Sequence, residues 1–196
     1  RDGLVTGVQT CALPILLSRD FLGIPIDTGQ ILPFDKFISE YNNKANQLST
    51  PLDNEFLHRN DELKEILDYL RNGDLLLLSG APGVGKTKIA IEAINNFIEQ
   101  NNTYTSYAIA KKDVDIFEDL RIQLSVDKDY FLLIDDANRQ HSNLTQILGV
   151  FKEDRKGNIK IIITVRNYAL NDIYKLTNNL DKHIVDIKKF TDDEII

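Results

Sequence analysis

The segment from residue 75 to residue 100 leaves this chain few possible folds. Four leucines at 75–78 precede the octapeptide Gly80-Ala81-Pro82-Gly83-Val84-Gly85-Lys86-Thr87, and apolar residues then recur at helical spacing. A short apolar run predicts a buried strand, and the later spacing predicts an amphipathic helix. We expect positive φ at the three glycines, which turns backbone N–H groups inward, and the helix dipole adds positive charge near Lys86. The segment therefore predicts a strand, an anion-binding loop and a helix.

The octapeptide predicts a site for a nucleoside triphosphate and Mg2+. All eight residues of 80–87 are candidate nucleotide contacts. The ammonium group of Lys86 would reach the β- and γ-phosphates, which also makes it a catalytic candidate, and the hydroxyl of Thr87 would be a ligand of Mg2+. The alternative is an accidental glycine turn. Four fixed positions rarely coincide by chance, however, and here they lie between an apolar strand and an amphipathic helix.

Apolar runs alternate with helical patterns along the rest of the chain. Asn60 is the predicted N-cap of a helix that ends at Gly73. Continuous apolar strands that alternate with helices are typical of a parallel sheet covered on both faces. We therefore predict an α/β protein, a three-layer α/β/α fold with about five mostly parallel strands. The predicted strands are 75–78, 103–110, 130–134, 159–165 and 183–187, and the later helices are 86–100, 114–124, 144–151 and 169–178.

Polar residues follow two of the predicted strands. Asp135 and Asp136 follow the apolar run 131–134, at the end where open parallel sheets bind ligands. Asp135 is a candidate for the Mg2+ shell, reached through water, and Asp136 for orienting or deprotonating the attacking water. The alternative is that these residues only cap a helix or form a turn. Arg166 follows the run 161–165 and is a candidate sensor of the γ-phosphate, or else a surface partner of a carboxylate.

Composition excludes several other classes of protein. A formal net charge of −7 and an isoelectric point near 5.0 argue against a general nucleic-acid or anionic-membrane binder. No run of apolar residues is long enough to span a membrane. Cys11 is the only cysteine, so neither a disulfide framework nor a thiolate metal site is expected, and a cytoplasmic location is compatible with this.

The two ends of the chain need separate treatment. Residues 5–15 resemble the translation of a sequencing adapter, so we exclude 1–15 from fold reasoning; a secretory signal is the alternative, but no sustained apolar core follows. Residues 16–55 are irregular, with a short helical spacing and a polar linker before the domain predicted at 56–190. Thr191 lies three residues before Glu194, a capping box that opens a helix. We expect the chain to be a fragment that stops inside this helix.

Three motifs together, GAPGVGKT, FLLIDD and IIITVR, resemble the STAND class of P-loop NTPases, which is related to the AAA+ group and includes novel STAND, NACHT-like and AP-ATPase-like domains. Residues 56–63 resemble the F-x-G-R-x-x-E-L motif of that class, which implies that Arg59 contacts the nucleotide. Residues 187–194 resemble its junction with a helical lid. Two positions differ from the pattern: His58 replaces a glycine, and Asp136 replaces the glutamate of AAA+ proteins.

The resemblance implies a domain that binds ATP with Mg2+, hydrolyses ATP slowly and uses the ATP state as a switch for homo-oligomerisation, often in bacterial defence against phage. Three alternatives remain open. A P-loop small-molecule kinase usually carries its Walker aspartate on the strand next to the loop strand. A loader-type AAA+ ATPase needs DNA contacts. A nucleotide-binding scaffold binds the nucleotide without hydrolysing it.

Overall fold

A computed structural model describes residues 29–45, 51–52, 54, 56, 58–109 and 116–190. The adapter-like segment 5–15 and the capping box at 191–194 lie outside the described residues, as do most of the predicted linker and the start of the helix predicted at 114–124.

Strands and helices alternate as predicted from residue 60 onward. The strands are β1 (Ile31–Pro33), β2 (Leu75–Gly80), β3 (Tyr104–Ile109), β4 (Asp129–Ile134), β5 (Ile159–Arg166) and β6 (His183–Ile187). The α-helices are α2 (Phe34–Ala45), α3 (Asn60–Leu70), α4 (Lys86–Gln100), α5 (Phe117–Gln123), α6 (His141–Phe151) and α7 (Leu170–Leu176). Two short 3-10 helices are η1 (Ala137–Arg139) and η2 (Asn167–Ala169).

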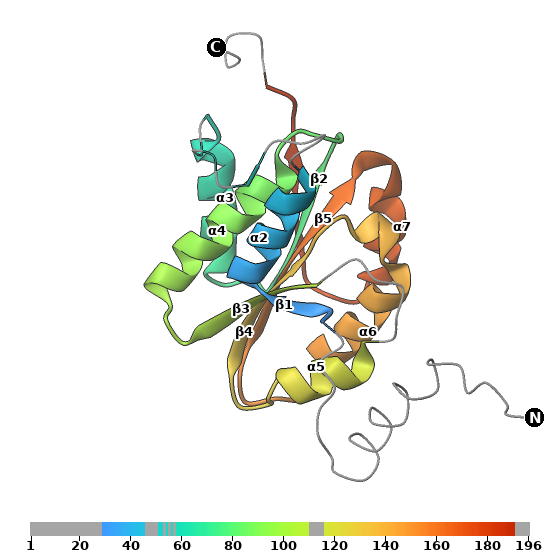
Figure 1. Ribbon diagram of the computed structural model, residues 1–196. Coiled ribbons are helices and arrows are strands. Elements are labelled where there is room, and N and C mark those ends of the chain that lie inside the picture. The colour runs from blue at the N-terminus through green and yellow to red at the C-terminus, as the bar shows by residue number, and fades with distance from the viewer. Residues whose placement is uncertain are drawn as a thin grey trace, which may run out of the picture.

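The strands of the described region form one sheet in the order β1-β3-β4-β5-β2-β6. Every neighbouring pair is parallel except β1 and β3, which are antiparallel. Helices α2, α3 and α4 lie on one face and α5, α6 and α7 on the other (Figure 1). The predicted three-layer α/β/α fold is therefore confirmed, with β1 as a sixth strand that the sequence pattern did not indicate.

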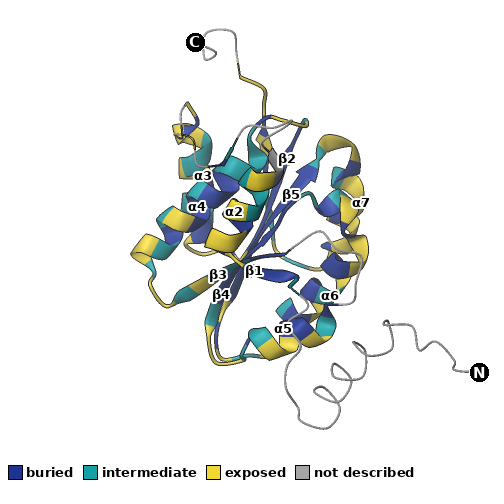
Figure 2. Ribbon diagram, in the orientation of Figure 1, coloured by how far each residue is buried: buried dark blue, intermediate teal, exposed yellow. Residues whose placement is uncertain are grey.

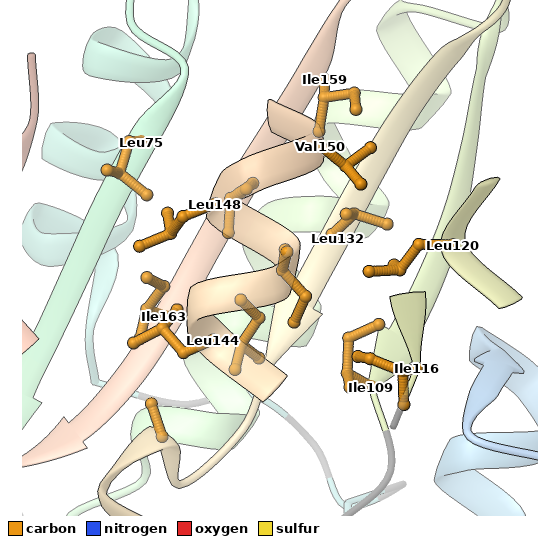
Figure 3. Close-up of a cluster of buried hydrophobic side chains, with 14 of the residues drawn as sticks. Leu75, Ile109, Ile116, Leu120, Leu132, Leu144, Leu148, Val150, Ile159 and Ile163 are labelled. Carbon is orange, nitrogen blue, oxygen red and sulfur yellow. The ribbon is translucent and has the colours of Figure 1, made fainter. Parts of the chain in front are cut away.

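Alternating side chains of the strands supply two separate cores. Leu75 and Leu77 pack with the cluster beneath α5 and α6, whereas Leu76 and Leu78 pack with the cluster beneath α3 and α4. This division follows from the two-residue period of a strand, and it explains why the central strands β2 and β4 carry consecutive apolar residues. The central strands β2, β4 and β5 are buried along almost their whole length (Figure 2). Figure 3 shows side chains of α6, including Leu144 and Leu148, gathered over the sheet.

The start of α3 differs from the prediction. Asn60 is the first residue of the helix, and Arg59 occupies the capping position without a side-chain hydrogen bond to the helix end. Negative charge from Asp61 and Glu62 in the first turn complements the helix dipole in place of a side-chain cap. The cap was wrongly predicted because an asparagine beside an apolar periodicity is read as a cap by default.

Candidate nucleotide-binding site

The loop between β2 and α4 has the backbone shape that binding an anion requires. Gly83 and Gly85 have φ values of 77° and 90°, in the left-handed region that favours glycine. Gly80 does not have the predicted positive φ and instead ends β2. A Cβ at Gly80 would lie 2.5 Å from the backbone oxygen of Ile187, so glycine is needed there because β6 passes too closely for a side chain.

Lys86 lies over this loop. Its Nζ donates to the backbone oxygens of Gly80 at 3.0 Å and Ala81 at 2.7 Å. Burial lowers the pKa of the Lys86 ammonium below its usual value of 10.5, although Asp136 and Asp135 act in the opposite direction. A cation is therefore held at the loop with part of its hydration removed, which strengthens its interaction with an anion.

Asp135 joins three elements at the carboxyl ends of the strands. It follows β4, is 3% exposed, and its Oδ1 accepts hydrogen bonds from the hydroxyl of Thr87 at 2.7 Å and the hydroxyl of Thr164 at 2.8 Å. The amide of Gln140 donates to its backbone oxygen at 2.7 Å. Thr87 and Asp135, both predicted as metal ligands, are thus brought into direct contact. Thr164 and Gln140 were not singled out from the sequence, because a single polar residue in or near an apolar element carries no distinctive signal.

Asp136 is held between two arginines. Its backbone has φ 56°, and its N–H donates to the hydroxyl of Thr164 at 2.8 Å. Its carboxylate lies 3.2 Å from Nε of Arg166 and 3.5 Å from Nε of Arg139. Arg166 therefore makes the carboxylate ion pair considered as the alternative to sensing, at the same edge where a nucleotide phosphate would lie. Nothing in the sequence distinguished Arg139 from other charged residues.

Arg59 contacts the backbone of the loop at Val84. Arg59 is 4% exposed, and its Nη2 donates to the backbone oxygens of Val84 at 2.8 Å and Lys188 at 2.9 Å. Nη1 lies 3.1 Å from a carboxylate oxygen of Glu62. Among the residues predicted for the site, the structure brings together the loop, Asp135, Asp136 and Arg166, and it places Arg59 in contact with Val84 of the loop.

A polar cavity of about 450 Å³ lies at the opposite edge of the sheet, near the amino ends of the strands. Its buried cation, Lys160, donates to the backbone oxygen of Gly73 and to Asp74, each at 2.8 Å. The amide of Asn101 donates to the backbone oxygen of Phe97. Because Lys160 and Asn101 already have hydrogen-bond partners within the protein, we do not consider this cavity a candidate site beside the loop. Within the described residues, no cluster of three or more His, Cys, Asp or Glu side chains suggests a further metal site.

The strand order separates this domain from one of the alternatives. The loop follows β2 and Asp135 follows β4, and β5 pairs with both of these strands and lies between them. The small-molecule kinase alternative expects the two strands to be neighbours, so the order disfavours it. In the described part of the chain, no helix is both long and apolar enough to cross a membrane.

Residues 57–194 match the sequence profile of the family described as Novel STAND NTPase 3. The chain belongs to this family. The predicted STAND resemblance is thereby confirmed, and the coordinates show where the motifs of a novel STAND NTPase 3 domain lie relative to one another.

Solved structures of AAA+ ATPases share the fold. Hsp104 in a closed state with ATPγS and FITC-casein matches with a TM-score of 0.53 and 16% identity, covering 84% of this chain and 31% of that chain. PCH-2 of C. elegans matches with a TM-score of 0.52 and 17% identity, covering 69% and 44%. Hsp104 of S. cerevisiae with casein, in an extended conformation, matches with a TM-score of 0.51 and 12% identity, covering 86% of this chain and 31% of that chain. At these identities the likeness shows the fold alone, and the chain spans less than half of each of these proteins.

Proposed function

We propose that this novel STAND NTPase 3 domain binds ATP with Mg2+ and hydrolyses it slowly, as a nucleotide-controlled switch. The observation that carries the proposal is the 2.7 Å hydrogen bond between the hydroxyl of Thr87 and Oδ1 of Asp135. These residues lie 48 positions apart, one at the start of α4 and the other after β4. Their contact places a hydroxyl and a carboxylate beside an anion-binding loop, the donor set that Mg2+ with a triphosphate needs.

The residues present fit such a ligand. Thr87 and Asp135 offer hard oxygen donors, which Mg2+ prefers over nitrogen or sulfur. Gly83 and Gly85 turn the loop backbone so that N–H groups can converge, and nothing lies within 4 Å of the space a Cβ would take at Gly83. Lys86 adds a positive charge at the loop, where, among the described residues, its Nζ donates to the backbone carbonyls of Gly80 and Ala81 and can exchange them for phosphate oxygens.

In the proposed mechanism, each residue acts on the phosphates or on water. The loop N–H groups and Lys86 bind the phosphate chain, and Thr87 with Asp135 holds the metal, Asp135 through water. Bound Mg2+ supplies positive charge that offsets the charge developing on phosphate oxygens. Asp136 orients the attacking water and accepts its proton. Arg166 exchanges its bond to Asp136 for a γ-phosphate oxygen, which reports that the triphosphate is intact.

Slow turnover is supported by the surroundings of Asp136. Its carboxylate is paired with Arg166 and Arg139, and those contacts must loosen before it can take a proton from water. The same observation favours a second candidate function, a nucleotide-binding scaffold without turnover. Measuring phosphate release from ATP by the full-length protein separates the two, because only the switch that hydrolyses ATP releases phosphate.

The biological role is proposed from the class. We propose that the full-length protein oligomerises with itself in the ATP state, in the cytoplasm, and signals in defence against phage. A loader-type ATPase is the remaining alternative, and it predicts DNA binding that weakens steeply as salt increases. The acidic net charge of −7 supports the signalling role over DNA loading.

Calorimetry with Mg2+-ATP tests the central step. We expect binding heat for the unaltered chain and none for Lys86→Ala, because the loop then lacks its cation. Lys88→Ala is a matched control two residues away, since the Lys88 Nζ donates to the backbone oxygen of Leu52 at 2.7 Å rather than to the loop. Equal heats for the unaltered chain and Lys86→Ala, or no heat for a folded unaltered chain, would overturn the proposal.

A further inference from the structure

Arg59 connects two parts of the chain that are far apart in sequence. One nitrogen, Nη2, donates both to Val84 in the phosphate loop and to Lys188, the first residue after β6. The ring of Phe190 packs against the same guanidinium, with Cζ 4.1 Å from the ring centroid. Figure 1 shows the chain after β6 leaving the molecule beside the carboxyl end of β2, and the pairing of Gly80 with Ile187 agrees with this placement.

The bond to Val84 has a consequence for phosphate binding. The described chain contains no cis peptide bond, and in a trans peptide the C=O and the following N–H point in opposite directions. Because the Val84 carbonyl points toward Arg59, the N–H of Gly85 points away from Arg59. Nε of Arg59 is also the nearest atom, at 3.9 Å, to the space that a Cβ on Gly85 would fill. Arg59 therefore sets the orientation of one of the N–H groups available to a phosphate.

We propose that Arg59 is a positioning residue that couples the phosphate loop to the chain leaving β6, so that nucleotide binding and docking of Phe190 favour each other. This inference rests on the proposed nucleotide binding. It assigns Arg59 a role through Val84 and Gly85 rather than by contact with the nucleotide. Coupling between two binding events is reciprocal, so whatever tightens one contact tightens the other by the same factor.

The chemistry of the site calls for arginine. The forked guanidinium bridges two carbonyls, pairs with Glu62 and presents a flat face to Phe190, which a lysine ammonium cannot do together. Nε is buried without a hydrogen-bond partner in the described region, so the side chain is held by its Nη atoms and by the ring. Loss of the ring would expose the guanidinium and loosen its hold on Val84.

A tryptophan at position 190 reports docking directly. The chain contains no tryptophan, so Phe190→Trp supplies a single intrinsic fluorophore that retains the cation–π contact. We expect saturating Mg2+-ATPγS to shift or quench its emission in the full chain. Adding Arg59→Lys in this background should remove most of that response even at saturating nucleotide. An emission spectrum unchanged by nucleotide, with binding verified by calorimetry, overturns the coupling and leaves the proposed function standing.

Affinity provides the second measurement. We expect Phe190→Ala to weaken Mg2+-ATPγS binding about threefold to tenfold, the equivalent of one cation–π contact. Tyr174→Ala is the matched control. Tyr174 is 44% exposed and Phe190 is 38% exposed. The Tyr174 ring also makes a cation–π contact, with Lys182 Nζ 4.3 Å from its centroid, but it lies on α7 and not on the phosphate loop. The affinity of the Tyr174→Ala variant for Mg2+-ATPγS should equal that of the unaltered chain. Equal losses in both variants, or none in Phe190→Ala, overturn the coupling, whereas absence of nucleotide binding in the unaltered chain overturns the proposed function as well.

Discussion

Thr164 allows a test in which two explanations of the site give different orders of stability. Its side chain is 1% exposed on β5. The hydroxyl donates to Oδ1 of Asp135 and accepts the backbone N–H of Asp136, both at 2.8 Å. Thr164→Val keeps the shape of the side chain and removes both hydrogen bonds. Thr164→Ser keeps the hydroxyl and removes one methyl group.

The two variants differ in the sizes of their expected effects. Valine leaves the backbone N–H of Asp136 without its hydrogen-bond partner, which costs about 1–3 kcal/mol. It also removes the hydrogen bond to the Asp135 carboxylate, and a bond to such a charged group contributes about 1.5–3 kcal/mol. The added methyl returns roughly 1 kcal/mol, so we expect Thr164→Val to lower the free energy of unfolding by about 1.5–5 kcal/mol. Thr164→Ser loses one buried methyl, which costs about 1 kcal/mol.

Urea unfolding followed by circular dichroism measures both free energies. If the hydroxyl connects Asp135 to Asp136, the order of stability is threonine, then serine, then valine. If Thr164 only fills space, valine is at least as stable as threonine, and serine is the least stable of the three. A valine variant as stable as the serine variant, or more stable, refutes the reasoning.

Three further changes test other parts of the domain. Asp136→Asn should keep ATP bound and stop phosphate release, because an amide does not accept the proton of water; release at the unaltered rate would remove Asp136 from the mechanism. His58 has φ 60°, so His58→Gly should stabilise the fold by up to about 1 kcal/mol and His58→Val should destabilise it by about 1–2 kcal/mol in urea unfolding; equal stabilities would show that the backbone there relaxes without cost. Burial lowers the pKa of Lys86, so between that lowered pKa and its usual 10.5 the unfolded chain binds more protons and stability should rise with pH. Lys86→Met should flatten this rise, and identical stability profiles for the two proteins over that range would contradict the shift.

The fold was predictable because β2, β4 and β5 each contain a run of at least three apolar residues and the helices that alternate with the strands have their own periodicity. β1 is different. It has only three residues and ends at Pro33. It is a strand because it pairs antiparallel with β3, where Ile31 lies opposite Ile109, a residue far away in sequence. A strand of this kind is defined by its neighbour rather than by its own pattern, so local periodicity does not reveal it.

The residues of the site divide in the same way. Lys86, Thr87 and Asp135 were predicted because their spacing relative to a glycine loop and a strand end carries the signal. Thr164 and Arg139 were not, because their importance lies in contacts between β5, η1 and the end of β4. Those contacts depend on strand order and register, which alternation along the chain does not specify.

The contacts of Asp135 bear on how much the proposed Mg2+ ligands would have to rearrange. A buried carboxylate without partners is costly, and here the hydroxyls of Thr87 and Thr164 both donate hydrogen bonds to it. A Mg2+ ion bound at this place would take over the role of the Thr87 proton, because the hydroxyl can turn its lone pairs toward the metal while Thr164 keeps Asp135 in position. In the proposed function, these hydrogen bonds preorganise the site, so that less of the binding free energy is used to order side chains.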